Sequence, residues 1–248
     1  QKGGTGKTTS AVNIAAGLVQ LGRRVLLVDM DPQANATLSL GIAGELEKTT
    51  FEVLDGTVSA AAAIHDRGGL SVIPSGLQLA GAELKFAGVP GREMLLRDAL
   101  EGIGANFDFI FIDCPPSLGL LTLNALGAAT AVYIPIQAEF LPIRGIAQLL
   151  DTVDLVRRRI NKGLTVRGVF GTFYDGRKTL NRDVIDHIKQ TFGTSVFNTY
   201  IRDNVALAEA PGRGQTIFEY EPASHGAADY LELCKEIIER CDYGKEKA

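Results

Sequence analysis

The sequence has too few cysteines for a disulfide framework or a four-ligand zinc site. Its three cysteines, Cys114, Cys234 and Cys241, are irregularly spaced, and we expect reduced thiols. Long apolar runs are also lacking. The runs FIFI at 109–112 and AVYIPI at 131–136 are far shorter than the roughly 20 residues of a membrane-spanning helix. No secretory leader precedes the first motif, so we expect a cytoplasmic protein that does not bind membranes.

An excess of basic residues is lacking as well. The formal net charge is -4, from 25 Lys and Arg against 29 Asp and Glu. This balance argues against a wholly basic nucleic-acid binder, so any contact with DNA must be regional.

No repeat, low-complexity tract or Pro/Ser-rich linker divides the chain. We therefore expect one domain over residues 1–248.

Short apolar runs alternate along the chain with longer stretches that carry apolar residues at helical spacing. This alternation is typical of an α/β fold, here a doubly wound, mostly parallel sheet with helices on both faces. The predicted strands cover residues 24–29, 70–74, 107–113, 131–137, 166–173 and 195–201. The predicted helices cover residues 7–21, 91–104, 119–128, 143–161, 179–192 and 224–241.

The segment KGGTGKTT at residues 2–9 is the strongest local signal. Its glycines, Gly3, Gly4 and Gly6, allow the backbone around Thr5 to fold closely about an anion. A helix that begins near Lys7 would add its unpaired amides and the positive end of its dipole. The segment therefore predicts a phosphate-binding loop, although a glycine-rich turn before an ordinary amphipathic helix is the plainer alternative.

The residues that end this loop suit the phosphates of ATP and a magnesium ion. Lys7 would reach the β and γ phosphates, Thr8 would supply a hydroxyl to Mg²⁺, and Thr9 would contact the α phosphate. The strict P-loop pattern requires glycine where this chain has Gln1, and a second lysine, Lys2, stands beside the first loop glycine.

A loop of this kind connects a buried strand to a helix, yet only Gln1 precedes it. A central strand that is lost leaves the backbone groups of its neighbours unpaired. We therefore expect that the printed sequence starts inside the native one and that the first strand lies outside it.

Three aspartates follow predicted strands at the sheet edge where ligands bind in open parallel sheets. Asp29 and Asp31 end one strand, on one side of it, and Asp113 ends another. We expect Asp31 to position the attacking water, Asp113 to hold Mg²⁺ through water, and Asp29 to support them. Asn35 has two open interpretations: it orients water or phosphate, or it caps the next short helix.

These residues are similar to the ParA/Soj branch of the ParA/MinD family of P-loop ATPases, whose deviant Walker A motif carries an extra lysine at the position of Lys2. Further segments share the resemblance: VDMDPQANAT, IDCPPSLGLLTLNAL, PIQAEF, NVALAEAPGRG and YEPASHGAADYLEL. The resemblance implies slow ATP hydrolysis by a homodimer formed when ATP binds, in which Lys2 of each subunit reaches the other's phosphates. Lys2, Lys7 and Asp31 would then be the catalytic residues.

The resemblance also implies partners and further contacts. The ATP-bound dimer would bind double-stranded DNA without sequence preference, making the protein nucleoid-associated, and a ParB-like centromere-binding protein would stimulate hydrolysis and release it. Adenine would lie near residues 172–175 and 202–204, the latter including Asp203 and Asn204. Five cations suit phosphate contacts, or else form an ordinary solvated surface: Arg177, Lys178, Arg182, Arg202 and Arg213. Many relatives carry a further arginine where this chain has Ala206.

Three other classes use related phosphate sites. A MinD-like membrane switch would need a basic amphipathic tail, whereas the segment at 230–241 carries several glutamates, and its apolar residues, including Leu231 and Ile238, are spaced to pack inward. A subunit like the nitrogenase iron protein would need two suitable cysteines per chain, and only Cys114 lies near the predicted site. A ligase resembling dethiobiotin synthetase would turn over ATP with a small acid.

Overall fold

The computed structural model describes residues 4–139 and 143–245, and it confirms the α/β class. One sheet has the strand order β2-β3-β1-β4, and a second pairs β5 with β6. Every pair is parallel except β2 with β3. The strands are β1 (Val25–Asp29), β2 (His65–Arg67), β3 (Leu70–Ile73), β4 (Phe109–Asp113), β5 (Ala131–Gln137) and β6 (Thr165–Thr172).

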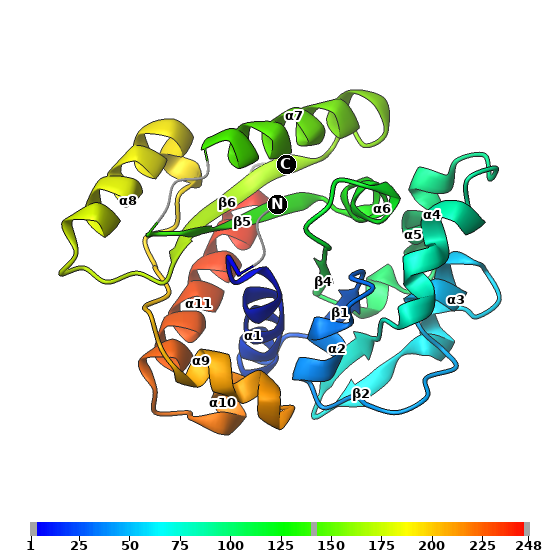
Figure 1. The fold of residues 1–248 in the computed structure, drawn as a ribbon, viewed down its shortest axis with the longest axis horizontal. Coiled ribbons are helices and arrows are strands. Elements are labelled where there is room, and N and C mark those ends of the chain that lie inside the picture. The colour runs from blue at the N-terminus through cyan, green and yellow to red at the C-terminus, as the bar shows by residue number, and fades with distance from the viewer. Residues whose placement is uncertain (1–3, 140–142, 246–248) are drawn as a thin grey trace.

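The helices surround these sheets (Figure 1). Helices α1 and α11 lie on one side of β5 and β6, and α7 runs along the other side. The helices are α1 (Lys7–Gln20), α2 (Asn35–Ser39), α3 (Thr50–Leu54), α4 (Ala82–Lys85), α5 (Leu95–Glu101), α6 (Leu120–Ala128), α7 (Ile143–Arg159), α8 (Thr179–Phe192), α9 (Ala206–Glu209), α10 (Ile217–Tyr220) and α11 (His225–Lys245). None of them, within the parts of the chain described, is long and apolar enough to cross a membrane.

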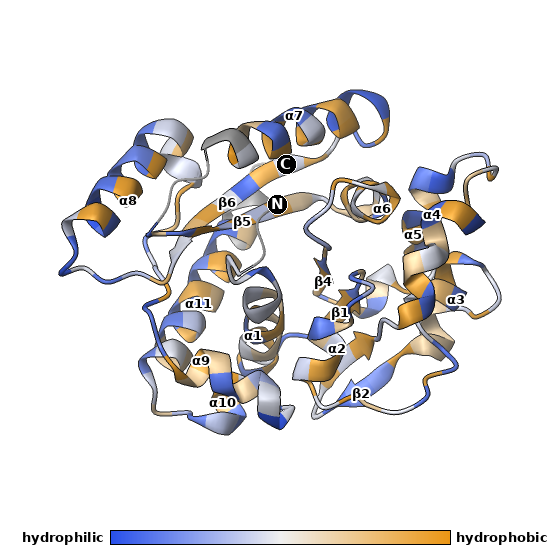
Figure 2. Ribbon diagram, in the orientation of Figure 1, coloured by the Kyte–Doolittle hydropathy of each residue, from blue (hydrophilic) through white to orange (hydrophobic). Residues whose placement is uncertain are grey.

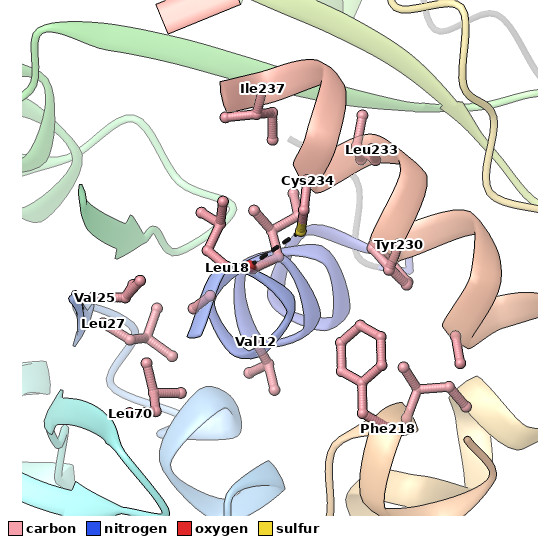
Figure 3. Packing of buried hydrophobic residues seen from close by; sticks show 14 of the residues in the cluster. Val12, Leu18, Val25, Leu27, Leu70, Phe218, Tyr230, Leu233, Cys234 and Ile237 are labelled. Atoms are coloured by element: carbon pink, nitrogen blue, oxygen red, sulfur yellow. Dashed lines mark hydrogen bonds between the residues drawn. The ribbon is translucent and has the colours of Figure 1, made fainter. Parts of the chain in front are cut away.

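Buried side chains form a separate core on each side of the four-stranded sheet. One core joins β1 and β3 to α1 and α11, and it contains Leu18, Tyr230 and Leu233 (Figure 3). The other joins the opposite face of the same strands to α3, α4 and α5. Apolar residues dominate β1, whereas the edge strand β2 is hydrophilic (Figure 2). Both faces of the sheet are therefore covered, as the alternating pattern predicts.

The predicted strand at 195–201 is wrong as a strand, because the structure records only isolated bridges there. The segment does run beside β6, since Phe197 N–H donates to Val169 O and Ile201 N–H to Gly171 O. Between these contacts the amide of Thr199 donates to Glu236 of α11, at 3.2 Å. The Thr199 amide therefore bonds to a side chain of α11 and not to the backbone of β6, which interrupts the ladder of a continuous strand.

The predicted helix at 91–104 is shorter than expected. It begins as a 3₁₀ turn at Arg92–Met94 and continues as α5 over Leu95–Glu101. The prediction also missed short elements, among them β2 and helices α2, α3, α4, α9 and α10. Each has at most five residues, too few for a periodic pattern to show.

The two sheets are separated by a cavity of about 1100 Å³. Strand β4 lines one wall and β5 the other, with α1 contributing Ala11 and Ile14. Neither strand pairs with the other, and within the described residues no strand pairs with the edge that each presents to the cavity. Residues 1–3 lie outside the described part of the chain, and the expected first strand stays a prediction.

Candidate functional site

The glycine-rich loop leads directly into α1 at the carboxyl end of β1 and β4. Gly4 and Gly6 have φ angles of 84° and 82°, in the left-handed region that favours glycine. Gly6 is the N-cap of α1 and no side chain caps this helix, so its first amides are open to an anion. The predicted loop is thus built as expected from Gly4 onward, whereas Lys2 and Gly3 lie outside the described residues.

Two side chains outside the loop fix its backbone. The Thr172 hydroxyl, at the end of β6, donates to Thr5 O at 3.1 Å. The Asn13 side chain donates to Thr9 O at 2.8 Å and accepts from Ile217 N–H at 2.8 Å. Asn13 could not be predicted from the sequence, because a polar residue on the buried face of a helix carries no motif. Its contacts link the phosphate loop to the start of α10.

Asp113 lies beside this loop, as predicted, and one of its carboxylate oxygens has no partner among the residues that the structure describes. The side chain is 2% exposed, and Oδ2 is buried without a hydrogen bond. Thr8 hydrogen-bonds to the carboxylate. Burial, with smaller contributions from the negative charges of Asp29 and Asp31, raises the pKa of Asp113 to about 7.

This arrangement fits a magnesium ion. An unpaired, buried carboxylate oxygen next to a threonine hydroxyl is a set of hard oxygen donors, and such a set, completed by phosphate and water, is what Mg²⁺ prefers. Thr8 and Asp113, the two predicted metal residues, are therefore brought together.

Asp29 is a structural acid that organises the segment after β1. It lies opposite Asp113 in the β1–β4 register and is fully buried. Its carboxylate accepts hydrogen bonds from the Thr37 amide at 2.9 Å, the Thr37 hydroxyl at 2.7 Å and the Asp31 amide at 3.0 Å. Burial raises the pKa of Asp29, and these bonds oppose the shift. The expected supporting role of Asp29 thus has a clear physical basis.

Asp31 directs its carboxylate into the turn that precedes α2. Its Oδ1 accepts from the Gln33 amide at 2.9 Å, and its backbone O accepts from the Ser75 hydroxyl at 2.7 Å. The side chain is 7% exposed, so a ligand at the loop would find it largely desolvated. Asn35 is the first residue of α2 and Ala34 stands at the N-cap position, so the capping interpretation of Asn35 is wrong.

The turn after Asp113 has features of its own. Burial raises the pKa of the Cys114 thiol to about 12, and the charge of Asp113 adds to this shift. At neutral pH the free thiol is therefore protonated. Farther along, Glu83 Oε1 accepts from the Leu120 amide at 3.1 Å, at the start of α6. No sequence signal indicates Glu83, because its partner is 37 residues away.

A small cavity of about 110 Å³ lies beside the loop, where the resemblance implies adenine. Gly6, Thr9, Phe173 and Arg202 are among its lining residues. Phe173 has a φ angle of 53°, which is rare for a bulky residue and costs free energy. Of the neighbouring predicted pair, Asp203 donates its amide to Tyr174 O and Asn204 caps the next turn through the Ala206 amide.

The five predicted DNA-binding cations are mostly engaged within the chain. Arg177 pairs with Asp175, Lys178 with Glu139 and Arg202 with Asp229, while Arg182 donates to Gly176 O. A bridge between Tyr174 and Arg202 joins the loop after β6 to the loop that carries Arg202. Arg177, Lys178, Arg182 and Arg202 therefore lie on adjacent loops. Arg213 lies apart, at the end of the 3₁₀ turn Ala210–Arg213, and is exposed.

A glycine loop leading into a helix, with a lysine, a threonine and strand-end aspartates at the carboxyl edge of a parallel sheet, defines a P-loop nucleotide-binding protein. Comparison with known proteins narrows this class. The model of the AAA domain matches residues 1–166. The Soj sporulation initiation inhibitor of Bacillus subtilis is 47% identical over 96% of this chain and 95% of its own length.

The chromosome partitioning protein ParA of Myxococcus xanthus is 42% identical over 97% of this chain and 86% of its own length. The chain therefore belongs to the Soj/ParA family of chromosome-partitioning ATPases.

Solved structures agree with this fold. A Mycobacterium smegmatis protein described as cobyrinic acid a,c-diamide synthase, with a bound ATP analogue and magnesium, has a TM-score of 0.88 and 39% identity over 98% of this chain and 93% of its own. The cell division ATPase MinD of Pyrococcus furiosus has a TM-score of 0.76 and 27% identity over 96% of this chain and 95% of its own.

Proposed function

We propose that this protein is an ATP-dependent DNA-partitioning ATPase that uses ATP and Mg²⁺. The observation that carries the proposal is the unpaired, buried oxygen of Asp113, which lies next to Thr8 at the glycine loop. Membership of the Soj/ParA family supports the same chemistry, as do the ATP analogue and magnesium in the similar Mycobacterium smegmatis structure.

Each residue of the site has a distinct role. The amides from Gly3 to Thr9 bind phosphate oxygens, and Lys7 places its ammonium against the β and γ phosphates. Thr8 and Asp113 hold magnesium, which neutralises charge on the phosphates when it is bound. Asp31 orients the attacking water, and Asp29 keeps the Asp31 turn in place through Thr37. Asp203 and Asn204 follow Arg202, which lines the cavity proposed for adenine.

Hydrolysis belongs to a homodimer in this proposal. Lys2 of each subunit reaches the phosphates of the other, so that a second positive charge stabilises the phosphoryl group in the transition state. Replacing Lys2 with alanine leaves nucleotide binding intact but abolishes the ATP-driven dimer on sizing chromatography. Normal turnover by this variant would contradict the cross-subunit role.

The ATP-bound dimer binds double-stranded DNA without sequence preference, which places the protein on the nucleoid in the cytoplasm. Hydrolysis is slow until a ParB-like protein stimulates it. The cations Arg177, Lys178, Arg182, Arg202 and Arg213 are the proposed phosphate contacts. The ion pairs of Arg177 and Lys178 do not prevent this use, because exposed pairs contribute little to stability. Arg202 would contact DNA through the part of its side chain that its partly buried pair with Asp229 leaves exposed.

Binding of the purified protein to DNA with ATP, ADP or no nucleotide tests the proposal. We expect binding only with ATP and a steep loss with salt, about a thousandfold between low and moderate salt for about six phosphate contacts. If none of the three conditions supports binding, the partitioning function is wrong. ATP turnover that depends on a small acid acceptor would favour a synthase, and ATP-dependent binding to anionic vesicles a MinD-like positioning ATPase.

A further inference from the structure

The Arg67 side chain, on the edge strand β2, joins two segments that lie far apart in the sequence. Its Nε donates to Leu40 O at 2.7 Å, just after α2, and its terminal nitrogen NH2 donates to Gly214 O at 3.2 Å. The other terminal nitrogen donates to Glu219 Oε1 at 2.9 Å. With 32% of its surface exposed, the side chain lies at a partly buried junction. All three bonds use the planar fork of a guanidinium, which lysine lacks.

The two segments also touch through their backbones. A Cβ on Gly214 would lie 2.7 Å from Gly41 Cα, and one on Gly41 would lie 3.1 Å from Gly214 O. Gly41 and Gly214 both have positive φ, at 70° and 64°. No side chain separates the segments, so a displacement of one is passed directly to the other.

Each segment leads to a different part of the site. Residues 31–41 begin at Asp31, the residue proposed to orient the attacking water, and Thr37 anchors them on Asp29. Residues 210–216 carry Arg213, the proposed DNA contact, and end at Thr216. Glu219, the ionic partner of Arg67, accepts from the Thr216 amide with its other oxygen, at 2.8 Å.

The phosphate loop reaches the same junction from a third direction. Asn13 of α1 binds Thr9 O at one end and the Ile217 amide at the other. The Arg67–Glu219 pair thus lies where three parts of the chain converge: α1, residues 31–41 (the Asp31 segment) and residues 210–216 (the Arg213 turn). Nothing in the nucleotide chemistry itself requires an arginine on β2.

We propose that Arg67 is a positioning residue that transmits the state of the nucleotide site to the Arg213 turn. When the γ phosphate engages Asp31, residues 31–41 shift, and the bonds of Arg67 to Leu40 O and Gly214 O move the Arg213 turn with them. The consequence for DNA binding rests on the proposed function. The mechanical coupling between the two segments does not.

Amide hydrogen exchange of the full chain tests the coupling without DNA. A non-hydrolysable ATP analogue slows exchange of residues 36–42 and of residues 212–216 by about tenfold relative to ADP. In Arg67→Lys the response of 36–42 remains, whereas that of 212–216 disappears, and the affinity for the analogue stays within about twofold. Arg24→Ala is the control. Arg24 directly precedes β1 and binds Asp108, and its removal retains both responses.

A second variant separates coupling from folding. Glu219→Gln keeps an oxygen that can accept from Thr216 but removes the ionic partner of Arg67, and it loses the 212–216 response in the same way. The proposal is overturned if 212–216 responds normally in Arg67→Lys, if the parent shows no response there, or if Arg67→Lys loses both responses together.

DNA binding then distinguishes the two proposals. If the parent protein binds DNA, Arg67→Lys lowers the ratio of affinity with the ATP analogue to affinity with ADP by about tenfold. An unchanged ratio would overturn the coupling to DNA. If the parent binds no DNA but its exchange response in 212–216 depends on Arg67, the partitioning function fails and the coupling stands.

Discussion

Two buried aspartates on the same strand end have different contacts, and these contacts separate their roles at the residue scale. Asp29 has both carboxylate oxygens engaged by the segment it organises, whereas the Asp31 carboxylate accepts from the Gln33 amide through Oδ1. We predict that Asp31→Ala retains ATP affinity but blocks hydrolysis, which traps the dimer. Sizing chromatography with ATP and Mg²⁺ checks this, with the exposed Asp98→Ala as control. A monomeric Asp31→Ala protein would refute the assigned role.

The buried carboxyl of Asp113 predicts a dependence of stability on pH. Its pKa is raised from 3.8 to about 7, so the folded state binds this proton more tightly than the unfolded state. The contribution is fully present below about pH 4 and is lost as the pH rises toward 7. We predict that Asp113→Asn, without nucleotide or metal, removes a slope of up to about 1.4 kcal/mol per pH unit in that window.

Urea unfolding of both proteins between pH 4 and pH 7 measures this difference. Asp108 and Asp175 contribute slopes of the opposite sign at lower pH, since their arginine partners lower their pKa to about 2. These contributions are common to both proteins and cancel in the comparison. Parallel curves for Asp113→Asn and the parent would mean that Asp113 is ionised throughout.

At the scale of elements, the packing of α1 on α11 depends on Gly17. A Cβ at this position would lie 2.8 Å from Cys234 Sγ and 3.1 Å from Phe218 Cζ. We predict that Gly17→Val destabilises the fold by about 1–3 kcal/mol through overpacking. Gly102→Val is the matched control, since its Cβ would meet no atom within 4 Å, and it shifts stability by about 0.5 kcal/mol or less. Urea unfolding without nucleotide compares them, and equal midpoints would contradict the packing argument.

Elements with a strong local pattern were predictable from the sequence, and those made by distant contacts were not. The strand over Ala131–Gln137 has the predicted bounds, and the glycine loop, Thr8 and Asp113 meet as predicted. The segment at 195–201 has a strand-like composition, but Glu236 takes one of its amides. Arg67 is missed for the same reason, because its partner Glu219 is 152 residues away and no periodicity reports such a pair.

At the scale of the whole molecule, the expected single sheet is divided in two by the cavity between β4 and β5. Both strands are parallel to their partners, and the edges they present toward the cavity pair with no strand in residues 4–139 and 143–245. Phe111, Ile112, Ile134 and Ile136 line it, so the walls are apolar on both sides. Unpaired backbone groups and an apolar void both disfavour the folded state. A parallel strand between β4 and β5 would relieve both and join the sheets.

We predict that a β-strand added before residue 1 stabilises the fold. An extension of about six residues, rich in valine and isoleucine, suits a central strand that is buried on both faces. It leads into the glycine loop from the cavity and raises the midpoint of thermal unfolding by about 5–10 °C. A Gly/Ser extension of equal length is the control, because it adds chain without β propensity or apolar surface. If both extensions unfold at the same temperature, a strand does not occupy the cavity.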